Sequence, residues 1–399
     1  MKSADVIVIG GGLHGCSAAL HLARAGVKVI VLEKDHVARH ASGVNAGGVR
    51  RLGRHLAEVP LSVASLELWK CIEDLVGDGC GFESAGQIKV AENEAELDRL
   101  KARVAELQAL GFHHEVIIGA EELREYLPAL ASHCVGGILC AEDGAALPFR
   151  TTLAFKRKAE SLGVRFFEGA RADSLTRDNS IWRVASDAGA FEAPAVVNAA
   201  GGWAGRIAEQ LGEPVPMIAT GLMLAITAPV APFVKPVVGA TGQPLSFKQY
   251  ANGTVIIGGG QRGHADLDTN RTVLDYEKLA LNARTAMELF PRMRGADIVR
   301  AWAGIEGMMA DDIPVIGPSG TAPGVWHAFG FSGHGFQLGP IVGLIVAELV
   351  TTGTTRLPIA PFSIERFGGV ERTCVRASCA QASTAITSAP AAKQQAARN

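Results

Sequence analysis

The sequence predicts a mixed α/β protein with two domains, and three observations lead to this prediction. At 399 residues the chain exceeds the usual size of one compact core, so two units of about 150 to 200 residues are expected. The first fifty residues follow a pattern of strand, glycine turn, helix and strand. Apolar runs on both sides of Asn252-Gly253 are typical of a hairpin in an antiparallel sheet.

The composition is that of a globular protein and argues against several classes of partner. Hydrophobic residues make up 48% and charged residues 20%, with a net charge of −2. Such a balance provides no electrostatic attraction to DNA, RNA or an anionic membrane, so we expect no nucleic-acid partner. The 7 cysteines are odd in number and include no CxxC pair, which favours neither a zinc site nor a complete disulfide framework. We therefore expect no bound metal and a reducing cytoplasm.

No secretory or membrane-crossing segment is expected. The short apolar run near the N-terminus is followed by no small-residue cleavage site. The longest apolar segment, 340–350, is interrupted by Gly343 and Glu348 and is too short to span a bilayer.

The segment Val6-Ile7-Val8-Ile9-Gly10-Gly11-Gly12-Leu13-His14-Gly15 predicts a dinucleotide-binding turn. The apolar run 6–9 is a short buried strand, a helix over 16–25 ends at Gly26, and a second apolar strand over 27–32 leads to Glu33. Gly10 permits the tight turn, Gly12 lets the backbone approach a pyrophosphate, and Gly15 permits close packing of a helix whose N-terminus favours anions. Glu33 is placed to accept a hydrogen bond from a ribose hydroxyl and disfavours a 2′-phosphate.

A second segment, Val255-Ile256-Ile257-Gly258-Gly259-Gly260-Gln261-Arg262-Gly263, matches the same glycine pattern but not its context. The residues from His264 to Asn270 carry no apolar helical stripe and no second strand that ends in an acid. We therefore interpret this segment as a hairpin strand followed by a loop. Lys248 and Tyr250, on the preceding strand, share one face, which either lines a pocket or faces water.

Nucleotide-type segments alternate along the chain with segments of another character. The leucine spacing over 92–110 predicts an amphipathic surface helix, and an apolar strand over 195–198 leads into Gly201-Gly202-Trp203. We expect two discontinuous domains: a Rossmann-type nucleotide domain of 1–80, 145–218 and 298–368, and an antiparallel-sheet substrate domain of 81–144 and 219–297. Residues 369–399 lack periodicity and are expected to form a disordered tail.

Further motifs connect these segments to one enzyme family. They are Ala41-Ser42-Gly43-Val44-Asn45-Ala46-Gly47-Gly48-Val49-Arg50, Val197-Asn198-Ala199-Ala200-Gly201-Gly202-Trp203-Ala204, Ala301-Trp302-Ala303-Gly304, Asp312-Ile313-Pro314-Val315-Ile316-Gly317-Pro318 and Gly330-Phe331-Ser332-Gly333-His334-Gly335-Phe336-Gln337. In this order, after the N-terminal glycine turn, they resemble the D-amino-acid oxidase superfamily of FAD-dependent oxidoreductases over about residues 4–366. Within it, the chain is most similar to the branch of sarcosine oxidases, D-hydroxyproline dehydrogenases and opine oxidase β subunits.

The resemblance implies FAD as the cofactor. It places the adenine beside the backbone near Ala172 and the flavin beside the 42–48 loop and the 330–337 segment. That segment is expected to lead into a helix with Pro340 in its first turns, where a missing N–H costs nothing. The cofactor-binding residues that the resemblance carries over are Gly10, Gly12, Leu13, His14, Gly15, Glu33, Lys34, Ser42, Asn45, Ala46, Gly47, Gly48, Ala172, Ala200, Gly201, Trp203, Gly304, Gly330, Gly333, His334, Gly335, Phe336 and Gln337.

The sequence departs from the family at the sites of covalent attachment and substrate binding. FAD is expected to be non-covalent, because 301–310 contains no cysteine, and a tethered FMN is not expected, because Pro148 stands where the tethering histidine of sarcosine oxidase β subunits would be. Gln337 and Glu306 stand where relatives have a lysine and an arginine for the substrate carboxylate.

Other residues therefore become candidates for substrate contacts. Arg50 and Arg54 either bind the substrate carboxylate or form a solvated basic turn. Glu306 either receives a cationic or hydroxyl group of the substrate or pairs with Arg300. The full set of candidate catalytic residues is Arg50, Arg54, Tyr250, Glu306, His334 and Gln337.

The activity that the resemblance implies is oxidation of an amino or imino acid, such as proline, hydroxyproline, a sarcosine-like compound or an opine. Hydride transfer from Cα to flavin N5 would give an imine. The electron acceptor is open between oxygen, a quinone reached at the membrane surface and a partner subunit. The lysine that many oxidases use to activate oxygen is not evident, with Arg262 as its nearest match, and this favours a dehydrogenase. Alternatives are a flavin-bearing subunit of a heteromer and an NAD-dependent dehydrogenase, and a homo-oligomer is also open.

Overall fold

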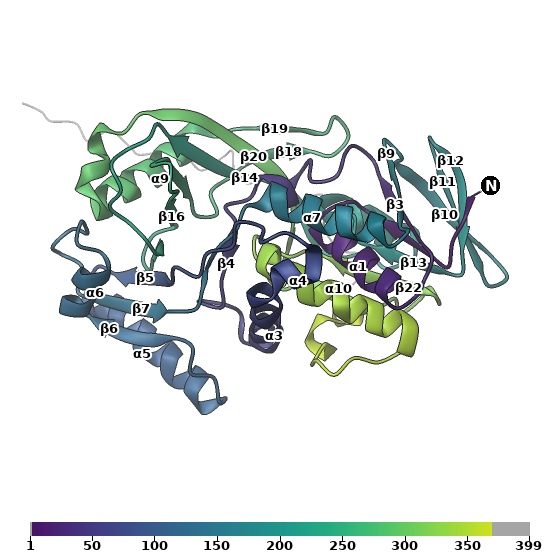
Figure 1. The fold of residues 1–399 in the computed structure, drawn as a ribbon, viewed down its shortest axis with the longest axis horizontal. Helices are drawn as coiled ribbons and strands as arrows, with labels where there is room; N and C mark the ends of the chain where they lie inside the picture. Colours follow the sequence, from purple (N-terminus) through teal and green to yellow (C-terminus); the bar gives the residue numbers. More distant parts are fainter. Residues whose placement is uncertain (1, 369–399) are drawn as a thin grey trace, which may run out of the picture.

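The computed structural model describes residues 2–368; residue 1 and the segment 369–399, where a disordered tail is expected, lie outside the described residues. Two large sheets dominate the fold and lie side by side along the long axis of the protein (Figure 1). We call them the nucleotide sheet and the large sheet.

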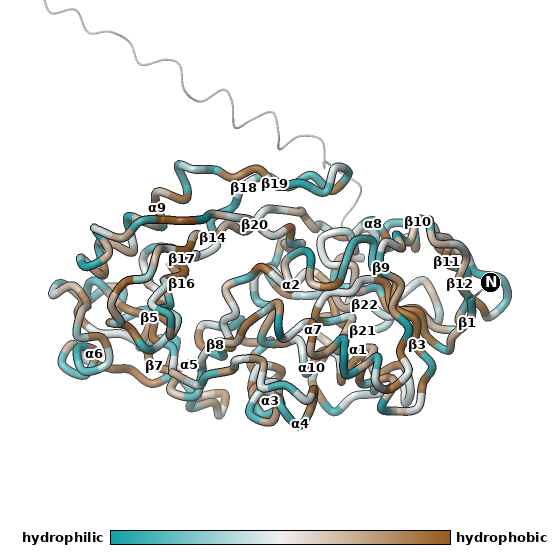
Figure 2. The backbone as a smooth tube through the Cα atoms, turned by 45° about the horizontal axis from the view of Figure 1, so that its top comes forward, coloured by the Kyte–Doolittle hydropathy of each residue, from teal (hydrophilic) through white to brown (hydrophobic). Residues whose placement is uncertain are grey.

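The nucleotide sheet has six strands in the order β21-β22-β13-β2-β3-β9, all parallel except the edge strand β21. Its strands are β2 (Val6–Ile9), β3 (Val29–Glu33), β9 (Arg165–Glu168), β13 (Ala195–Asn198), β21 (Val315–Pro318) and β22 (Val325–Phe329). Val6 and Val8 pack toward the helices, whereas Ile7 and Ile9 face the opposite core, so β2 is apolar on both sides, as a buried parallel strand must be. Figure 2 shows this apolar run on the neighbouring strand β3.

Helices cover one face of this sheet. They are α1 (Leu13–Arg24), α3 (Val59–Lys70), α7 (Pro148–Ser161) and α10 (Gly335–Thr352). α10 packs against both α1 and α3, and the Ser17 Oγ donates a hydrogen bond to the Pro340 carbonyl oxygen. The last helix of the described chain therefore packs directly on the first.

The large sheet has ten strands in the order β19-β18-β14-β17-β16-β15-β5-β7-β6, with β20 paired to β14. They are β5 (Gln87–Ala91), β6 (Val116–Gly119), β7 (Gly136–Cys140), β14 (Met217–Thr227), β15 (Val237–Ala240), β16 (Ser246–Gln249), β17 (Val255–Gly258), β18 (Arg262–Asp266), β19 (Arg271–Val273) and β20 (Ile298–Met309). One face buries Ile88, Val90, Val238 and Phe247 against α9 (Tyr276–Leu289), because side chains alternate between the two faces of a strand. The other face carries the residues that line the site described below.

Smaller elements complete the fold. A four-stranded sheet contains β1 (Lys2–Ser3), β10 (Ala172–Asp178), β11 (Ile181–Ser186) and β12 (Gly189–Ala193), and β4 (Gly48–Val49) pairs with β8 (Gly144–Ala145). The remaining helices are α2 (Ala41–Val44), α4 (Ile72–Val76), α5 (Glu94–Ala109), α6 (Ala120–Tyr126) and α8 (Ala204–Gln210), with 3₁₀ turns at Leu56–Glu58, Gly201–Trp203, Pro291–Gly295, Ala360–Phe362 and Ile364–Phe367.

Several local predictions are confirmed. The 92–110 helix is α5, capped by the Asn93 side chain, and the 195–198 strand is β13. β16 and β17 form the hairpin around Asn252-Gly253, so the second glycine pattern begins in an antiparallel strand, as its context indicated. α1 begins at Leu13 rather than at residue 16, because the glycine turn itself forms the helix start.

One expectation about α10 is wrong. The helix begins at Gly335, which puts Pro340 beyond the first turn, where its missing N–H removes a helical hydrogen bond. By length and composition alone α10, with 18 residues and a mean hydropathy of 1.5, could cross a bilayer. Because 72% of it is buried inside the protein, packing against α1 and α3 accounts for its apolar character.

The expected domain ranges stay a prediction, with one point of tension. β20 begins at the boundary assigned to the nucleotide domain, but it pairs along its length with β14 of the large sheet. The strand pairing therefore favours a boundary after Met309 rather than before Ile298.

Candidate functional site

A cavity of about 1170 Å³ runs between the two sheets. Its lining comes from the β2–α1 turn, the 41–48 loop, the 328–336 segment and the inner face of the large sheet. One continuous space thus reaches from the nucleotide sheet, which we call the cofactor end, to the large sheet, which we call the substrate end.

The glycine turn at the cofactor end is closed to any side chain. Gly10 has a φ of 112°, and a Cβ there would overlap the carbonyl oxygen of Ala199. A Cβ on Gly15 would overlap the carbonyl oxygen of Gly10, so Gly15 packs behind the turn and does not line the cavity. The turn therefore presents backbone N–H groups at the start of α1, where a pyrophosphate is favoured.

Glu33, the acid expected to bind the ribose, lies where the dinucleotide-binding turn requires it. Glu33 ends β3, lines the cavity and accepts hydrogen bonds from the Gly11 N–H (2.7 Å) and the Asp35 N–H (2.9 Å). Burial raises the pKa of Glu33, while these two N–H groups act to lower it. The side chain is thus fixed in place beside the turn.

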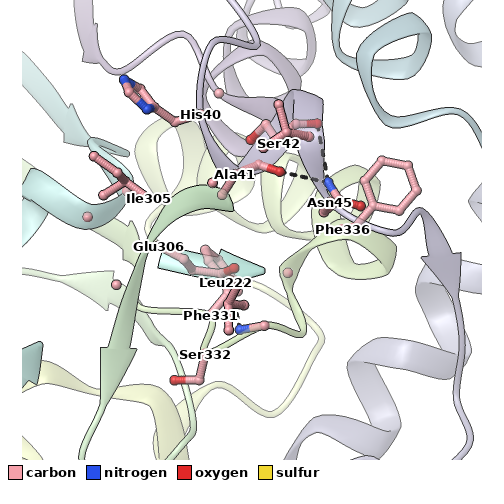
Figure 3. Close-up of a pocket in the computed structure, with 18 of the residues that line it drawn as sticks. His40, Ala41, Ser42, Asn45, Leu222, Ile305, Glu306, Phe331, Ser332 and Phe336 are labelled. Atoms are coloured by element: carbon pink, nitrogen blue, oxygen red, sulfur yellow. Dashed lines mark hydrogen bonds between the residues drawn. The ribbon is translucent and has the colours of Figure 1, made fainter. Parts of the chain in front are cut away.

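The 41–48 loop is held in shape by its own polar side chains. The Asn45 amide donates to the Ala41 carbonyl at 2.8 Å (Figure 3), and its oxygen accepts from the Gly47 N–H at 2.7 Å. The Ser42 hydroxyl accepts from the Leu13 N–H at 2.9 Å, which ties the loop to the start of α1.

A strap from the large sheet crosses the mouth of the cofactor end. This strap, the β18–β19 hairpin of residues 262–273, bonds to the nucleotide side at three places. The Trp203 Nε1 donates to the Leu267 carbonyl at 3.0 Å. The Asn270 amide donates to the Asp35 carboxylate at 2.7 Å and accepts from the Lys34 Nζ at 2.7 Å. Arg206 and Asp268 form the third contact, at 2.6 Å.

The 330–336 segment forms the floor between the two ends. The His14 ring stacks on the Phe331 ring at 3.7 Å, and burial lowers the pKa of His14 to about 3. Gly333, at a φ of 83°, turns its N–H toward the Glu306 carboxylate.

These features fit FAD. Every predicted cofactor-binding residue lines the cavity except Gly15 and Gln337. Anion-binding N–H groups lie at one end, and the space beyond them is long enough to continue to the large sheet. Within the described chain, no cysteine lines the cavity, so no thiol is available there to form a covalent bond with the flavin.

The two arginines expected near the substrate differ in their bonding. Arg54 is 1% exposed and donates to the carbonyl oxygens of Arg50 and His334 and to the Gln337 side chain. Its Nη1 also lies 3.7 Å from Glu58. Arg54 is therefore engaged by the protein itself.

Arg50, by contrast, lines the cavity with a guanidinium that has few partners. Its Nη1 donates to the Leu52 carbonyl at 2.7 Å, and it pairs with no acid among the described residues within 4.0 Å. Burial lowers its pKa, which Glu58 and Asp143 act to raise. It is the arginine that has donors to offer a ligand.

Glu306 is the acid at the substrate end, on β20. Its Oε1 accepts from the Gly333 N–H at 2.7 Å, and its side chain lies near Leu222 in the cavity (Figure 3). Burial raises the pKa of Glu306 to about 7. It does not pair with Arg300, which lies over the Trp302 ring.

Of the other predicted catalytic residues, one lines the cavity and two do not. His334 lines the cavity, and burial together with Arg50 and Arg54 lowers its pKa. Gln337 is fully buried, with its amide bonded to Arg54 and Ser62, and it does not line the cavity. Tyr250 does not line it either, and its ring lies 4.7 Å from the Lys248 Nζ.

Some polar residues of the site were not anticipated from the sequence. Gln87 and Lys89 on β5 line the cavity, and Glu58 lies buried with both oxygens lacking a hydrogen-bond partner in the described chain. Lys248, which was expected on a strand face that either lines a pocket or faces water, is 5% exposed and does not line the cavity. Its Nζ has no hydrogen-bond partner in the described chain and lies beside Gly47, and burial lowers its pKa to about 8. Alternation in the short strand Gln87–Ala91 was the signal for Gln87 and Lys89, since both share the polar face.

Comparison with known proteins gives a consistent result. The model of the FAD dependent oxidoreductase (DAO) family matches residues 5–349. Among curated relatives, glycine oxidase of Geobacillus kaustophilus is 28% identical, with 92% of this chain and 97% of the relative covered, and an opine oxidase subunit of Rhizobium meliloti is 27% identical, with 92% and 98% covered. Human mitochondrial dimethylglycine dehydrogenase is 25% identical, and this chain spans only 44% of its length. The solved L-proline dehydrogenase of P. horikoshii superposes with a TM-score of 0.85 at 28% identity, covering 92% of this chain and 98% of the other.

Proposed function

Because this chain belongs to the FAD-dependent oxidoreductase family, we propose that it oxidises an amino or imino acid at Cα to the corresponding imine. One observation carries this proposal. The substrate end of the cavity contains Arg50, which pairs with no acid of the described chain within 4.0 Å, and Glu306, an acid whose pKa is raised. Bound FAD supplies the hydride acceptor at its N5 atom.

Arg50 is the proposed ligand of the substrate carboxylate. A guanidinium offers two parallel N–H donors to a carboxylate, which fixes orientation as well as charge. Arg54 supports this role indirectly, since it donates to the Arg50 carbonyl oxygen. Orienting Cα in this way is the main contribution that a protein makes to such a transfer.

Glu306 is the proposed acceptor of the amine proton. An amino acid arrives with a protonated nitrogen. The nitrogen must lose this proton before its lone pair can assist the departure of the hydride from Cα. A carboxyl group with a pKa of about 7 is well matched to take that proton near neutral pH. The Gly333 N–H holds one of its oxygens and leaves the other for the substrate.

A flavin-bearing subunit of a heteromeric dehydrogenase is the second candidate. It is favoured by one observation: a relative that this chain matches over nearly its whole length is named as a subunit of an opine oxidase. Turnover by the isolated chain with an artificial electron acceptor would rule out a strict dependence on a partner.

Anaerobic bleaching of the flavin tests the main proposal. The holoenzyme is mixed with D- and L-proline, cis- and trans-hydroxyproline, sarcosine, glycine and opines, and the flavin absorbance is followed. At least one of them is expected to reduce the flavin. If none does, the amine-oxidising function is wrong.

A further inference from the structure

The substrate end of the cavity holds more positive charge than a simple amino acid can neutralise. The cations that line this end are Arg50, Arg54, Lys89 and Arg262, and the acid is Glu306. Arg54 is already paired with Glu58, and Arg262 is exposed, so solvent screens it. Arg50 and Lys89 remain, and neither pairs with an acid of the described chain within 4.0 Å.

Lys89 is held by the large sheet at the wall of the cavity. It is the middle residue of β5, and its neighbour in register on β15 is Gly239, which also lines the cavity. Because paired residues on adjacent strands project to the same face, the missing side chain at Gly239 leaves room beside Lys89. Burial lowers the pKa of Lys89, and the positive charges of Arg50 and Arg103 lower it further, whereas Glu115, which is itself paired with Arg103, acts to raise it.

A second observation points to a polar ligand at the same wall. Gln87, two residues before Lys89 on the same face of β5, is 8% exposed, and its Oε1 has no hydrogen-bond partner in the described chain. A buried amide without partners costs free energy unless a ligand completes it. The amide can present either its oxygen or its nitrogen, since the two are interchangeable by rotation.

Charge balance then selects the substrate class. Arg50 and Lys89 contribute two positive charges and ionised Glu306 one negative charge, which leaves one positive charge to be neutralised. A zwitterionic monocarboxylic amino acid has no net charge and would leave that excess in place. An amino dicarboxylate, with one ammonium and two carboxylates, has one net negative charge and restores neutrality.

We propose that the substrate is an amino dicarboxylate, an amine carrying two carboxylates, with one carboxylate on Arg50 and the second on Lys89 beside Gln87. This inference rests on the proposed oxidation of amino acids by the same site. It makes Lys89 a determinant of specificity, whereas Arg50 serves any amino acid substrate.

Two matched pairs of compounds test the proposal. Sarcosine and iminodiacetate differ by the carboxylate on the second carbon, as do N-ethylalanine and N-(1-carboxyethyl)alanine. Each is titrated into the holoenzyme, and binding is read from the change in the oxidised flavin spectrum, with flavin reduction followed separately. We expect the dicarboxylate of at least one pair to bind about tenfold or more tightly than its partner.

Variants of Lys89 separate its role from that of Arg50. Lys89→Met is expected to weaken binding of the dicarboxylate much more than binding of the monocarboxylate and so to remove the preference, while Lys89→Arg retains the preference. The control Lys101→Met, which removes an exposed lysine paired with Asp98 on α5, is expected to change neither. Flavin content and thermal unfolding of each variant report whether the fold is intact.

The outcomes distinguish the inference from the function on which it rests. Equal weakening of both compounds by Lys89→Met, or no preference in the unmodified enzyme, would overturn the second-carboxylate site. Flavin reduction by monocarboxylates alone would also overturn it, yet leave the amino acid oxidation standing. A lack of flavin reduction by every compound would remove both.

Discussion

The two ends of the cavity are built by different means. At the cofactor end, glycines and backbone N–H groups define the surface, and the polar side chains, such as Glu33 and Asn45, are bonded to the protein itself. At the substrate end, side chains from separate segments define the surface. Among the described residues, Arg50 and Lys89 pair with no acid within 4.0 Å, and the Gln87 Oε1 has no hydrogen-bond partner. The cofactor end therefore has a fixed shape that fits one ligand. The substrate end has polar groups without partners, to which a ligand can bind.

The largest effect is expected from filling the glycine turn at the cofactor end. In Gly15→Ala the new Cβ would overlap the Gly10 carbonyl oxygen, and such overpacking costs about 1–3 kcal/mol or more. We expect purified Gly15→Ala to retain little or no FAD, measured by the ratio of flavin to protein absorbance. Gly119→Ala is the control, because its Cβ would meet nothing within 4 Å and its φ is −80°. Full flavin content in Gly15→Ala would contradict a backbone-defined end.

The next effect concerns the acid of the substrate end. The base form of Glu306 is its carboxylate, which is populated above its pKa of about 7. The rate of flavin reduction is therefore expected to rise with pH through about 7 in the unmodified enzyme. Glu306→Gln should lose this inflection and slow reduction by roughly 10² to 10⁴, measured by stopped-flow at several pH values. An unchanged pH profile in Glu306→Gln would assign the proton to another group.

Removal of the unpaired arginine should act on binding more than on chemistry. Arg50→Met is expected to raise the Kd of the reducing substrate by about 100-fold, since a buried carboxylate would lose its charged partner. The limiting rate of flavin reduction at saturating substrate should fall much less. Arg284→Met, which alters an exposed arginine on α9, serves as the control. A large fall in the limiting rate with unchanged Kd would mean that Arg50 acts on the reacting atoms instead.

The smallest effect is expected at the strap. Asn270→Ala removes the hydrogen bonds that the side chain donates to Asp35 and accepts from Lys34, each worth about 1 kcal/mol, so FAD should dissociate several-fold faster. Turnover with excess FAD should be unchanged. Asn179→Ala is a matched control, because both asparagines have a positive φ (62° for Asn270 and 55° for Asn179) and Asn179 lies in an exposed turn. Equal FAD release from both variants would show that backbone strain, not the strap contact, is responsible.

The contrast between the ends also explains what the sequence could predict. The β2–α1 turn, Glu33 and the 42–48 loop could be assigned to one site because their expected roles depend on contiguous glycines and on spacing along the chain, and all three line the cavity. Lys89 and Gln87 could not be assigned in this way, because β5 and β15 become neighbours only through the pairing of distant segments. Alternation in a strand of five residues shows which side chains share a face, but not that this face meets a cavity.

The same reasoning accounts for the misplaced residues. Gln337 follows the Gly-His-Gly-Phe motif, which suggested a site residue, but the first turn of α10 directs its amide toward Ser62 and Arg54. Arg50 and Arg54 looked equivalent in sequence, and only the buried Glu58 and the nearby carbonyl oxygens distinguish them. Spacing identified the neighbourhood of these side chains, whereas packing decided their partners.

The order of strands in the nucleotide sheet has a consequence for how the protein is made. β2, near the start of the chain, lies beside β13, and β13 lies beside β22, which ends at Phe329. α1 packs against α10, which ends at Thr352. On the ribosome, the β2–α1 turn must wait until the segment through Thr352 has emerged before all these partners exist. Such long-range pairing slows folding, so the nascent chain is expected to acquire FAD only after the segment through Thr352 has been synthesised.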